Sequence, residues 1–356
     1  MQNKSRRGHK SARVLRCRRI DRLFSLSERF RTKPLIYYGL TIAASWAGVG
    51  SLLNSITMTR DYGIIPSLIW TAANILACVL FGWAVHRLPT LREVVKTKIA
   101  RYSLAVIAIF NIWLNMTGIQ TVFAESILGA SAGTIIAYAV AIGFVILLLW
   151  RGMIRNILTD GASWLIVYGL VVAITIAAYC QSGGELIQMS WGLNTSAMMT
   201  GLHKAGLLLS GPFIYVYFYE LLNYNESNGD ETKKVDMQKA FTLGGLFFGV
   251  YMMFAFSLAF VEFPPVLSFM KAVLISLIAI STLSTFIYSI YLVFGRKLGL
   301  LIDTAAVLTW AQVSDMGVMG IWTFGATIRS YLAVAFILVG IGIVMGKENI
   351  DKNIRA

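Results

Sequence analysis

Continuous apolar stretches of membrane-spanning length constrain this chain more than any other feature. They fall near residues 35–58, 63–85, 102–123, 131–150, 161–181, 197–222, 238–262, 267–293, 298–316 and 320–345. Each is close to the roughly 20 residues that an α-helix needs to cross a bilayer. Because 57% of the 356 residues are hydrophobic and only 13% are charged, no water-soluble core could bury this surface. The stretches are continuous and do not alternate as barrel strands do, so they predict an all-α integral membrane protein with ten transmembrane helices.

The distribution of basic residues supports ten spans. If the N-terminus is cytoplasmic and the sides alternate, cytoplasmic segments hold 27 of the 31 Lys and Arg residues, as the positive-inside rule requires. We therefore expect a multi-pass protein of the cytoplasmic (inner) membrane with both termini in the cytoplasm. The predicted organisation is a disordered basic tail at 1–33, a ten-helix core at 34–346 and a cytoplasmic tail at 347–356. The basic tail is expected to meet the anionic inner leaflet rather than nucleic acid.

Patterns of enzyme chemistry are missing from the sequence. It has no nucleophile–base pair, no Walker loop, no haem-ligand pattern and no His/Cys metal cluster. Cys17, Cys78 and Cys180 are too widely spaced for a disulfide framework or a metal site. We expect no enzyme and no organic cofactor.

Two helices contain candidate interruptions at corresponding positions. Ten helices divide into five plus five, and an odd number per half inverts the second half relative to the first. The first span contains Gly48 and Gly50, and the sixth contains Ser210-Gly211-Pro212, each about a dozen residues in. Such breaks mark binding sites in inverted-repeat transporters. The alternative is close helix packing through small residues.

An interrupted first helix would free backbone oxygens for a cation. Unwinding after Ala47 releases the carbonyls of Ala44 and Ala47 from their helical hydrogen bonds. In the eighth span, the hydroxyls of Ser281 and Thr282 lie over the carbonyl of Ile278. These five neutral oxygens would suit a sodium ion. The alternative for the two hydroxyls is back-bonding to carbonyls of their own helix.

Several segments resemble the sodium/solute symporter family, the sodium–glucose and sodium–proline cotransporters. The resemblance rests on residues 44–53, Pro89-Thr90-Leu91-Arg92-Glu93, Ser210-Gly211-Pro212-Phe213 and 280–284. It implies a LeuT-type 5+5 inverted repeat with broken helices 1 and 6, and a sodium ion held between helices 1 and 8 by the five oxygens named above. Asp160 matches an aspartate near the ion's release route; alternatively, it is an interfacial carboxylate paired with Arg151 or Arg155.

Further polar residues in the spans are candidates for solute contacts and gating. The expected solute-binding residues are Ser45, Trp46, Gly48, Ser51, Asn115, Ser210, Gly211 and Tyr217. Lys204 and Arg329 lie within spans, where charge is costly and marks functional candidates. Each is a candidate gate or charge partner. For Lys204 the alternative is snorkelling outward along the helix, and for Arg329 a partner at Asp315 is considered.

The expected function is a sodium-coupled symporter that moves a small polar solute by alternating access. One alternative is a proton-coupled or uncoupled transporter of the same fold. The other is a non-transporting membrane receptor or scaffold derived from a symporter.

Overall fold

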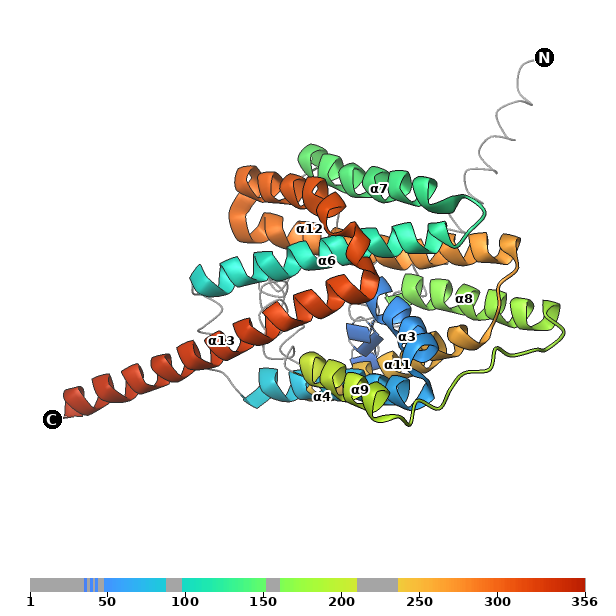
Figure 1. The fold of residues 1–356 in the computed structure, drawn as a ribbon. Coiled ribbons are helices and arrows are strands. Elements are labelled where there is room, and N and C mark those ends of the chain that lie inside the picture. Colours follow the sequence, from blue (N-terminus) through green and yellow to red (C-terminus); the bar gives the residue numbers. More distant parts are fainter. Residues whose placement is uncertain are drawn as a thin grey trace, which may run out of the picture.

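The computed structural model describes residues 35–36, 39–40, 42–43, 48–87, 98–151, 161–209 and 236–355. Within these ranges the secondary structure is helical and contains no strand (Figure 1). The main helices are α3 (Val49–Tyr62), α4 (Ile64–Arg87), α6 (Lys98–Ala124), α7 (Gly129–Arg151), α8 (Gly161–Gln181), α9 (Thr195–Leu209), α11 (Met237–Ser257), α12 (Pro265–Thr309) and α13 (Gly317–Arg355). Short 3₁₀ turns η2 (Leu258–Phe260), η3 (Trp310–Gln312) and η4 (Ser314–Met316) connect the last of them.

Helix boundaries follow the apolar stretches closely where these are described. The described part of helix α9 runs from Thr195 to Leu209. Residues 210–235 lie outside the described part. Helix α13 continues to Arg355, so residues 347–355 extend the last helix as ordered secondary structure.

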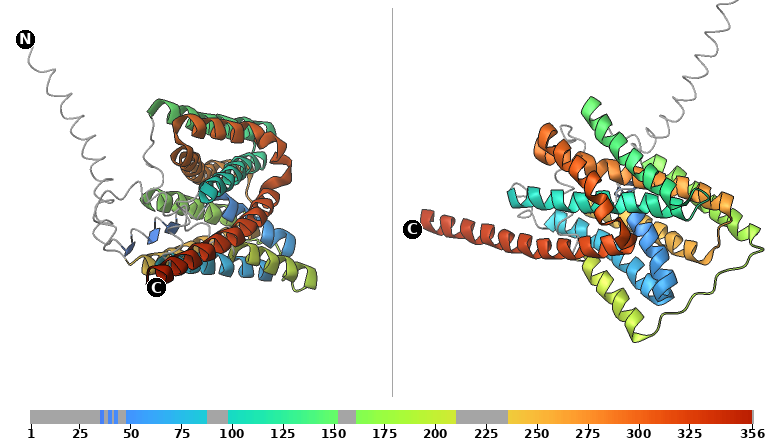
Figure 2. Two further views of the ribbon diagram at one scale, coloured as in Figure 1. Left: turned by 90° about the vertical axis from the view of Figure 1, so that its left-hand side faces the viewer. Right: turned by 45° about the horizontal axis from the view of Figure 1, so that its top comes forward.

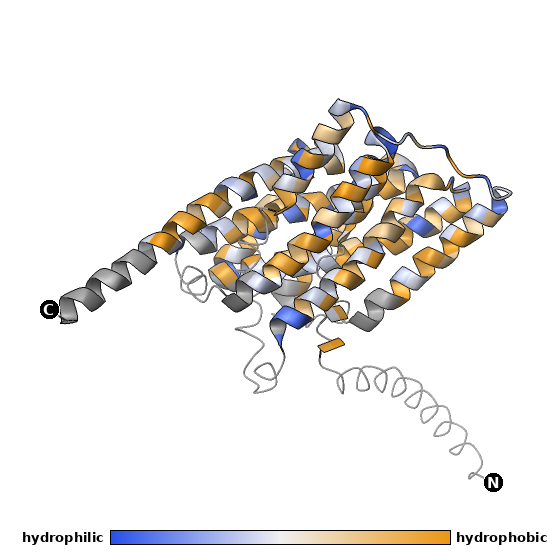
Figure 3. Cartoon of the chain, turned by 90° about the horizontal axis from the view of Figure 1, so that it is seen from below, coloured by the Kyte–Doolittle hydropathy of each residue, from blue (hydrophilic) through white to orange (hydrophobic). Residues whose placement is uncertain are grey.

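Six described helices are long and apolar enough to cross a membrane, by length and composition. These segments are Ile64–Trp83, Tyr102–Ala124, Gly129–Leu147, Gln238–Phe260, Pro265–Tyr291 and Ser314–Gly342. Apolar residues run along their whole length (Figure 3). The chain is thus a multi-pass membrane protein that is helical in its described ranges, while the count of ten spans stays a prediction.

Helix α6 lies at the centre of the bundle. Of its apolar span 67% is buried inside the protein, against 22% for the corresponding spans of α7 and α13. The indole Nε1 of Trp113 on α6 donates to the Ala306 carbonyl at 2.7 Å, and that of Trp310 donates to Thr117 Oγ1 at 2.8 Å. Two views show α7 and α13 at the periphery (Figure 2). Their exposed apolar side chains suit contact with lipid.

The connections after α3, α6, α8 and α11 meet at one end of the bundle. Ile64 N donates to the Ser190 carbonyl at 3.0 Å, and Ile187 N donates to the Phe260 carbonyl at 2.8 Å. Ser268 Oγ donates to the Glu125 carbonyl at 2.9 Å. This shared end is the one that the alternation of basic residues predicts to be extracytoplasmic.

The long run of α12 consists of two helices joined by a sharp turn. Gly295 has φ 75° and ψ 175°, a conformation open almost only to glycine. A Cβ on Gly299 would lie 2.7 Å from the Cα of Tyr291, so the second part folds back onto the first. Predicted spans 267–293 and 298–316 thus correspond to separate helices, although the second ends at Thr309 and continues as 3₁₀ turns.

Candidate functional site

A helix boundary lies at the predicted interruption of the first span. Gly48 has an extended backbone, with φ −81° and ψ 164°, and α3 begins at Val49. The Gly48 carbonyl accepts the first helical hydrogen bonds, from Ser51 N at 3.1 Å and Leu52 N at 3.3 Å. Helical residues also occur at 42–43, before this point.

The start of α3 packs against α12 and α6. A Cβ added to Gly48 would lie 3.4 Å from Cγ2 and 3.9 Å from Oγ1 of Thr282. A Cβ on Gly118 of α6 would lie only 2.6 Å from Cγ1 of Val49. The glycines therefore let the backbone of the first span approach both neighbours closely, which is the usual role of small residues between membrane helices.

Thr282 joins α12 to α6 at this junction. Its Oγ1 lies 2.6 Å from Asn115 Oδ1 and 3.0 Å from the Ile278 carbonyl oxygen. The side chains of Thr282 and Asn115 are both buried. A hydroxyl has one proton, so it can donate to only one of these acceptors at a time. The Asn115 amide nitrogen donates to the Asn111 carbonyl at 2.7 Å. We name Gly48, Asn115, Ile278 and Thr282 the helix junction.

The junction unites four of the residues that the sequence assigns to sodium or solute. The bond from Thr282 to the Ile278 carbonyl is the back-bond that was considered as the alternative. Ser51 lies in the first turn of α3, and Ser281 lies in α12, where only its backbone is described. Outside the described residues lie Ala44, Ser45, Trp46, Ala47, Asp160, Ser210, Gly211 and Tyr217.

Lys204 points into the protein rather than outward, contrary to the snorkelling alternative. Lys204 is only 6% exposed, because α9 packs against both α4 and α13. Nζ donates to Thr323 Oγ1 at 2.8 Å and lies 5.7 Å from the centre of the Trp322 ring. The Trp322 ring in turn meets Trp70 of α4 edge-on, with 4.6 Å between centroids. We name Lys204, Trp70, Trp322 and Thr323 the lysine cluster.

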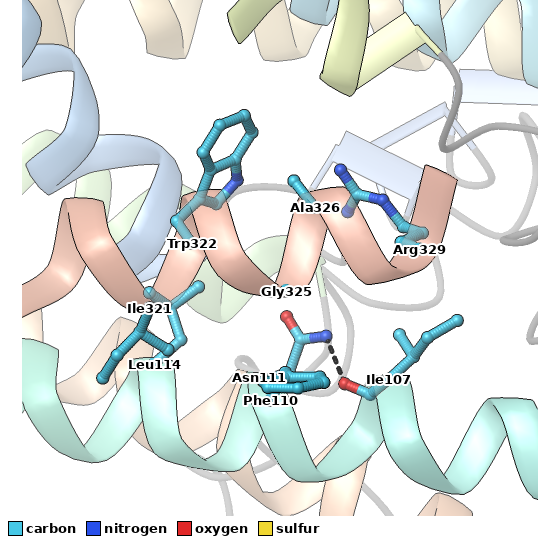
Figure 4. A pocket seen from close by; sticks show the side chains of 9 residues that line it. All are labelled: Ile107, Phe110, Asn111, Leu114, Ile321, Trp322, Gly325, Ala326 and Arg329. Carbon is cyan, nitrogen blue, oxygen red and sulfur yellow. Dashed lines mark hydrogen bonds between the residues drawn. The ribbon is translucent and has the colours of Figure 1, made fainter. Parts of the chain in front are cut away.

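Arg329 is buried in α13 and lines a small cavity with Asn111 (Figure 4). The cavity has a volume of about 20 Å³, room for a single water molecule. Arg329 lies twelve positions after Gly317, the first residue of α13, which is about 18 Å along a helix. Asp315, just before that helix, is therefore too far away to pair with Arg329.

Asp303 was not singled out from the sequence, although it lies inside the predicted span 298–316. It is fully buried, and among the described residues neither carboxylate oxygen has a hydrogen-bond partner. Ala306, one turn later, accepts the hydrogen bond from Trp113, so this face of the helix packs on α6. A charged residue in mid-span was the signal that could have identified it.

Comparison with known proteins adds little to this geometry. No model of a known protein family matches the chain, and no curated protein matches it. The crystal structure of an Eremococcus coleocola manganese transporter, in complex with an aromatic bis-isothiourea substituted compound, is similar at a TM-score of 0.35 and 15% identity. That similarity covers 90% of this chain and 73% of that chain. At this TM-score the likeness assigns neither fold nor function.

Proposed function

We propose that the protein is a sodium-coupled secondary transporter, a symporter of a small polar solute that works by alternating access. The observation that carries the proposal is the contact between Gly48, where the first span has an extended backbone, and Thr282 beside Asn115. An extended backbone in a membrane is tolerated where it is buried in protein or lines a cavity. Here a Cβ on Gly48 would lie 3.9 Å from the Thr282 hydroxyl oxygen, which itself bonds to the Asn115 amide oxygen.

The coupling ion would act at the helix junction. The carbonyls of Ala44, Ala47 and Ile278 and the hydroxyls of Ser281 and Thr282 are the proposed ligands. Sodium would draw the Thr282 hydroxyl oxygen toward itself and leave Ile278 O free to coordinate. Binding would thereby fasten the first span to α12 and favour one of the alternating states.

The finer architecture belongs to the same proposal. We infer ten spans in a LeuT-type inverted repeat, with Asp160 on the ion's release route and solute bound between the interrupted helices. Both termini would lie in the cytoplasm, where the tail at 1–33 would meet anionic lipid. The proposed orientation is supported by the end of the bundle where the connections after α3, α6, α8 and α11 meet. Arg60 and Lys271 belong to that end, whereas most Lys and Arg residues lie in other segments.

A binding screen followed by uptake tests the proposal. Thermal unfolding of the purified chain is measured with amino acids, sugars, nucleobases and carboxylates, each with and without sodium. Solutes that shift the unfolding temperature are then radiolabelled and offered to proteoliposomes with an inward sodium gradient. Sodium-dependent uptake supports symport, whereas a ligand-induced shift without any flux favours the receptor or scaffold alternative.

The variant Ser281→Ala with Thr282→Ala is expected to abolish the dependence on sodium. Thr309→Ala is the control, since Thr309 lies in the second helix of α12, after the turn at Gly295, is exposed and bonds to the Ala305 carbonyl at 2.7 Å. Unaltered sodium dependence in the double variant would remove the coupling claim.

Proton coupling is a second candidate because Asp303 is a buried carboxyl group without a hydrogen-bond partner among the described residues. Charge at such a site is costly, so uptake and release of a proton there could accompany the conformational change. Uptake driven by a pH gradient in the absence of sodium, and lost in Asp303→Asn, would select this candidate.

A further inference from the structure

The lysine cluster contains more hydrogen-bond donors than acceptors. A lysine ammonium carries three N–H groups, and Lys204 uses one of them, toward Thr323 Oγ1. The Thr323 hydroxyl proton itself is directed to the Met319 carbonyl at 2.8 Å. Trp70 is 1% exposed, and within the described chain its indole Nε1 has no acceptor.

No carboxylate neutralises Lys204 within the described part of the chain. The ion pairs found there join Lys239 to Asp236 and Lys271 to Glu125. A buried ammonium without a counter-charge is unfavourable, and the contact with the Trp322 ring offsets only part of that cost. Among the described residues, the donors of the lysine cluster therefore lack an anionic acceptor.

The position of Lys204 suits a transported ligand. It lies nine residues after Thr195, the start of α9, which is about 14 Å along a helix; in the predicted sixth span this would place it close to the middle of a bilayer core of about 30 Å. Arg329, a second buried cation, lies seven residues after Trp322, and both point to the same side of α13 (Figure 4).

We propose that Lys204 binds a carboxylate, or a similar anionic group, of the transported solute, so that the protein selects acidic solutes over neutral ones. The ammonium and the Trp70 indole supply donors that a carboxylate, with two acceptor oxygens, can use. This inference rests on the proposed transport function and specifies its substrate class.

Matched acids and amides test the inference on the full chain. Acetate and acetamide, succinate and succinamide, and benzoate and benzamide are titrated against the purified protein. Binding is followed by thermal unfolding and by tryptophan fluorescence, to which Trp70 and Trp322 contribute. At least one acid is expected to bind about tenfold more tightly than its amide. Equal affinity within every pair, or no binding by any acid, would overturn the inference.

An inorganic anion could supply the same chemistry, so chloride is titrated separately as its choline salt, because sodium is itself a proposed ligand. If chloride protects the protein as well as the carboxylates do at equal concentration, the assignment to a solute is wrong. Stronger protection by a carboxylate supports it.

Variants of the two buried lysines then test whether Lys204 causes the preference for acids over amides. Lys204→Met is expected to weaken acid binding more than amide binding and so to remove the preference for the acid, while Lys204→Arg retains the preference. Lys271→Met is the matched control, because it removes another buried lysine, whose contacts are with Glu125 and Phe263. Should Lys204→Met fail to fold, the wild type, Lys204→Arg and Lys271→Met still decide: an acid preference kept in both variants supports the assignment, and one lost in Lys271→Met contradicts it.

Sodium dependence separates this inference from the proposed function. Sodium-driven uptake of a neutral solute that is unchanged in Lys204→Met would refute the acidic-solute assignment and leave symport intact. Acid binding that depends on Lys204 but shows no response to sodium would refute sodium coupling and leave the anion site intact.

Discussion

Thr282 Oγ1 lies 2.6 Å from Asn115 Oδ1 and ties α12 to α6 beside the extended backbone of Gly48. The two residues are 167 positions apart in the chain. Their contact places the polar groups of the first, third and eighth predicted spans together inside an apolar bundle, where hydrogen bonds between helices stabilise packing.

Removing the Thr282 hydroxyl is expected to lower stability. Thr282→Val keeps the shape of the side chain but leaves Asn115 Oδ1 buried without this partner, at an expected cost of about 1–3 kcal/mol in the free energy of unfolding. Thr282→Ser retains the hydroxyl and should cost less. Chemical denaturation in detergent measures both, and an equal loss in the two variants would show that the methyl contact with Gly48 contributes as much as the hydrogen bond.

Gly118→Ala is expected to separate α6 from α3. The new Cβ would lie 2.6 Å from Cγ1 of Val49, whose β-branched side chain has few alternative rotamers. Overpacking of this kind costs about 1–3 kcal/mol. Adding Val49→Ala should restore part of the loss. Gly143→Ala in α7 is the control, because a Cβ there meets nothing within 4 Å; thermal unfolding compares the three.

Gly295→Ala is expected to destabilise the turn of α12 through the backbone alone. Its φ of 75° excludes ordinary side chains, yet nothing lies within 4 Å of a Cβ there. The expected cost is about 1–3 kcal/mol, seen as a lower unfolding temperature than in Gly143→Ala. A variant as stable as the wild type would contradict the left-handed conformation of the turn.

The link between Lys271 and Glu125 should stabilise the loop end of the bundle. Lys271 Nζ lies 3.3 Å from Glu125 Oε2 and 4.6 Å from the centre of the Phe263 ring. Because the lysine is buried, Glu125→Gln leaves its charge uncompensated and is expected to lower the unfolding temperature.

Lys239→Met is the control for that prediction. Its pair with Asp236 is largely exposed to solvent, and surface ion pairs contribute about 0–1 kcal/mol. Equal effects of Glu125→Gln and Lys239→Met would show that the buried link adds nothing beyond a surface pair.

Some features of the site could be predicted from the sequence because they depend only on residues close together in the chain. The glycines of the first span predict a boundary, and α3 does begin directly after Gly48. The back-bond from Thr282 to Ile278 follows from helical spacing alone. In contrast, Asp303 shows that a charged residue within a span is informative even where no motif surrounds it.

The direction of Lys204 could not be read from its position in α9. Snorkelling and burial are both open to a lysine at this depth, and the packing of α4 and α13 around it selects burial. Thr323, its hydrogen-bond partner, lies 119 positions away.

The sequence by itself determined that this protein is helical and crosses a membrane several times, because span length and apolar content are properties of consecutive residues. Which polar groups meet inside the bundle was decided only by the tertiary structure. Helix crossings and rotations, set by close approaches such as that of Gly118 and Val49, bring together side chains that no local pattern relates. The pairing of Asn115 with Thr282 and of Lys204 with Thr323 depends on that packing.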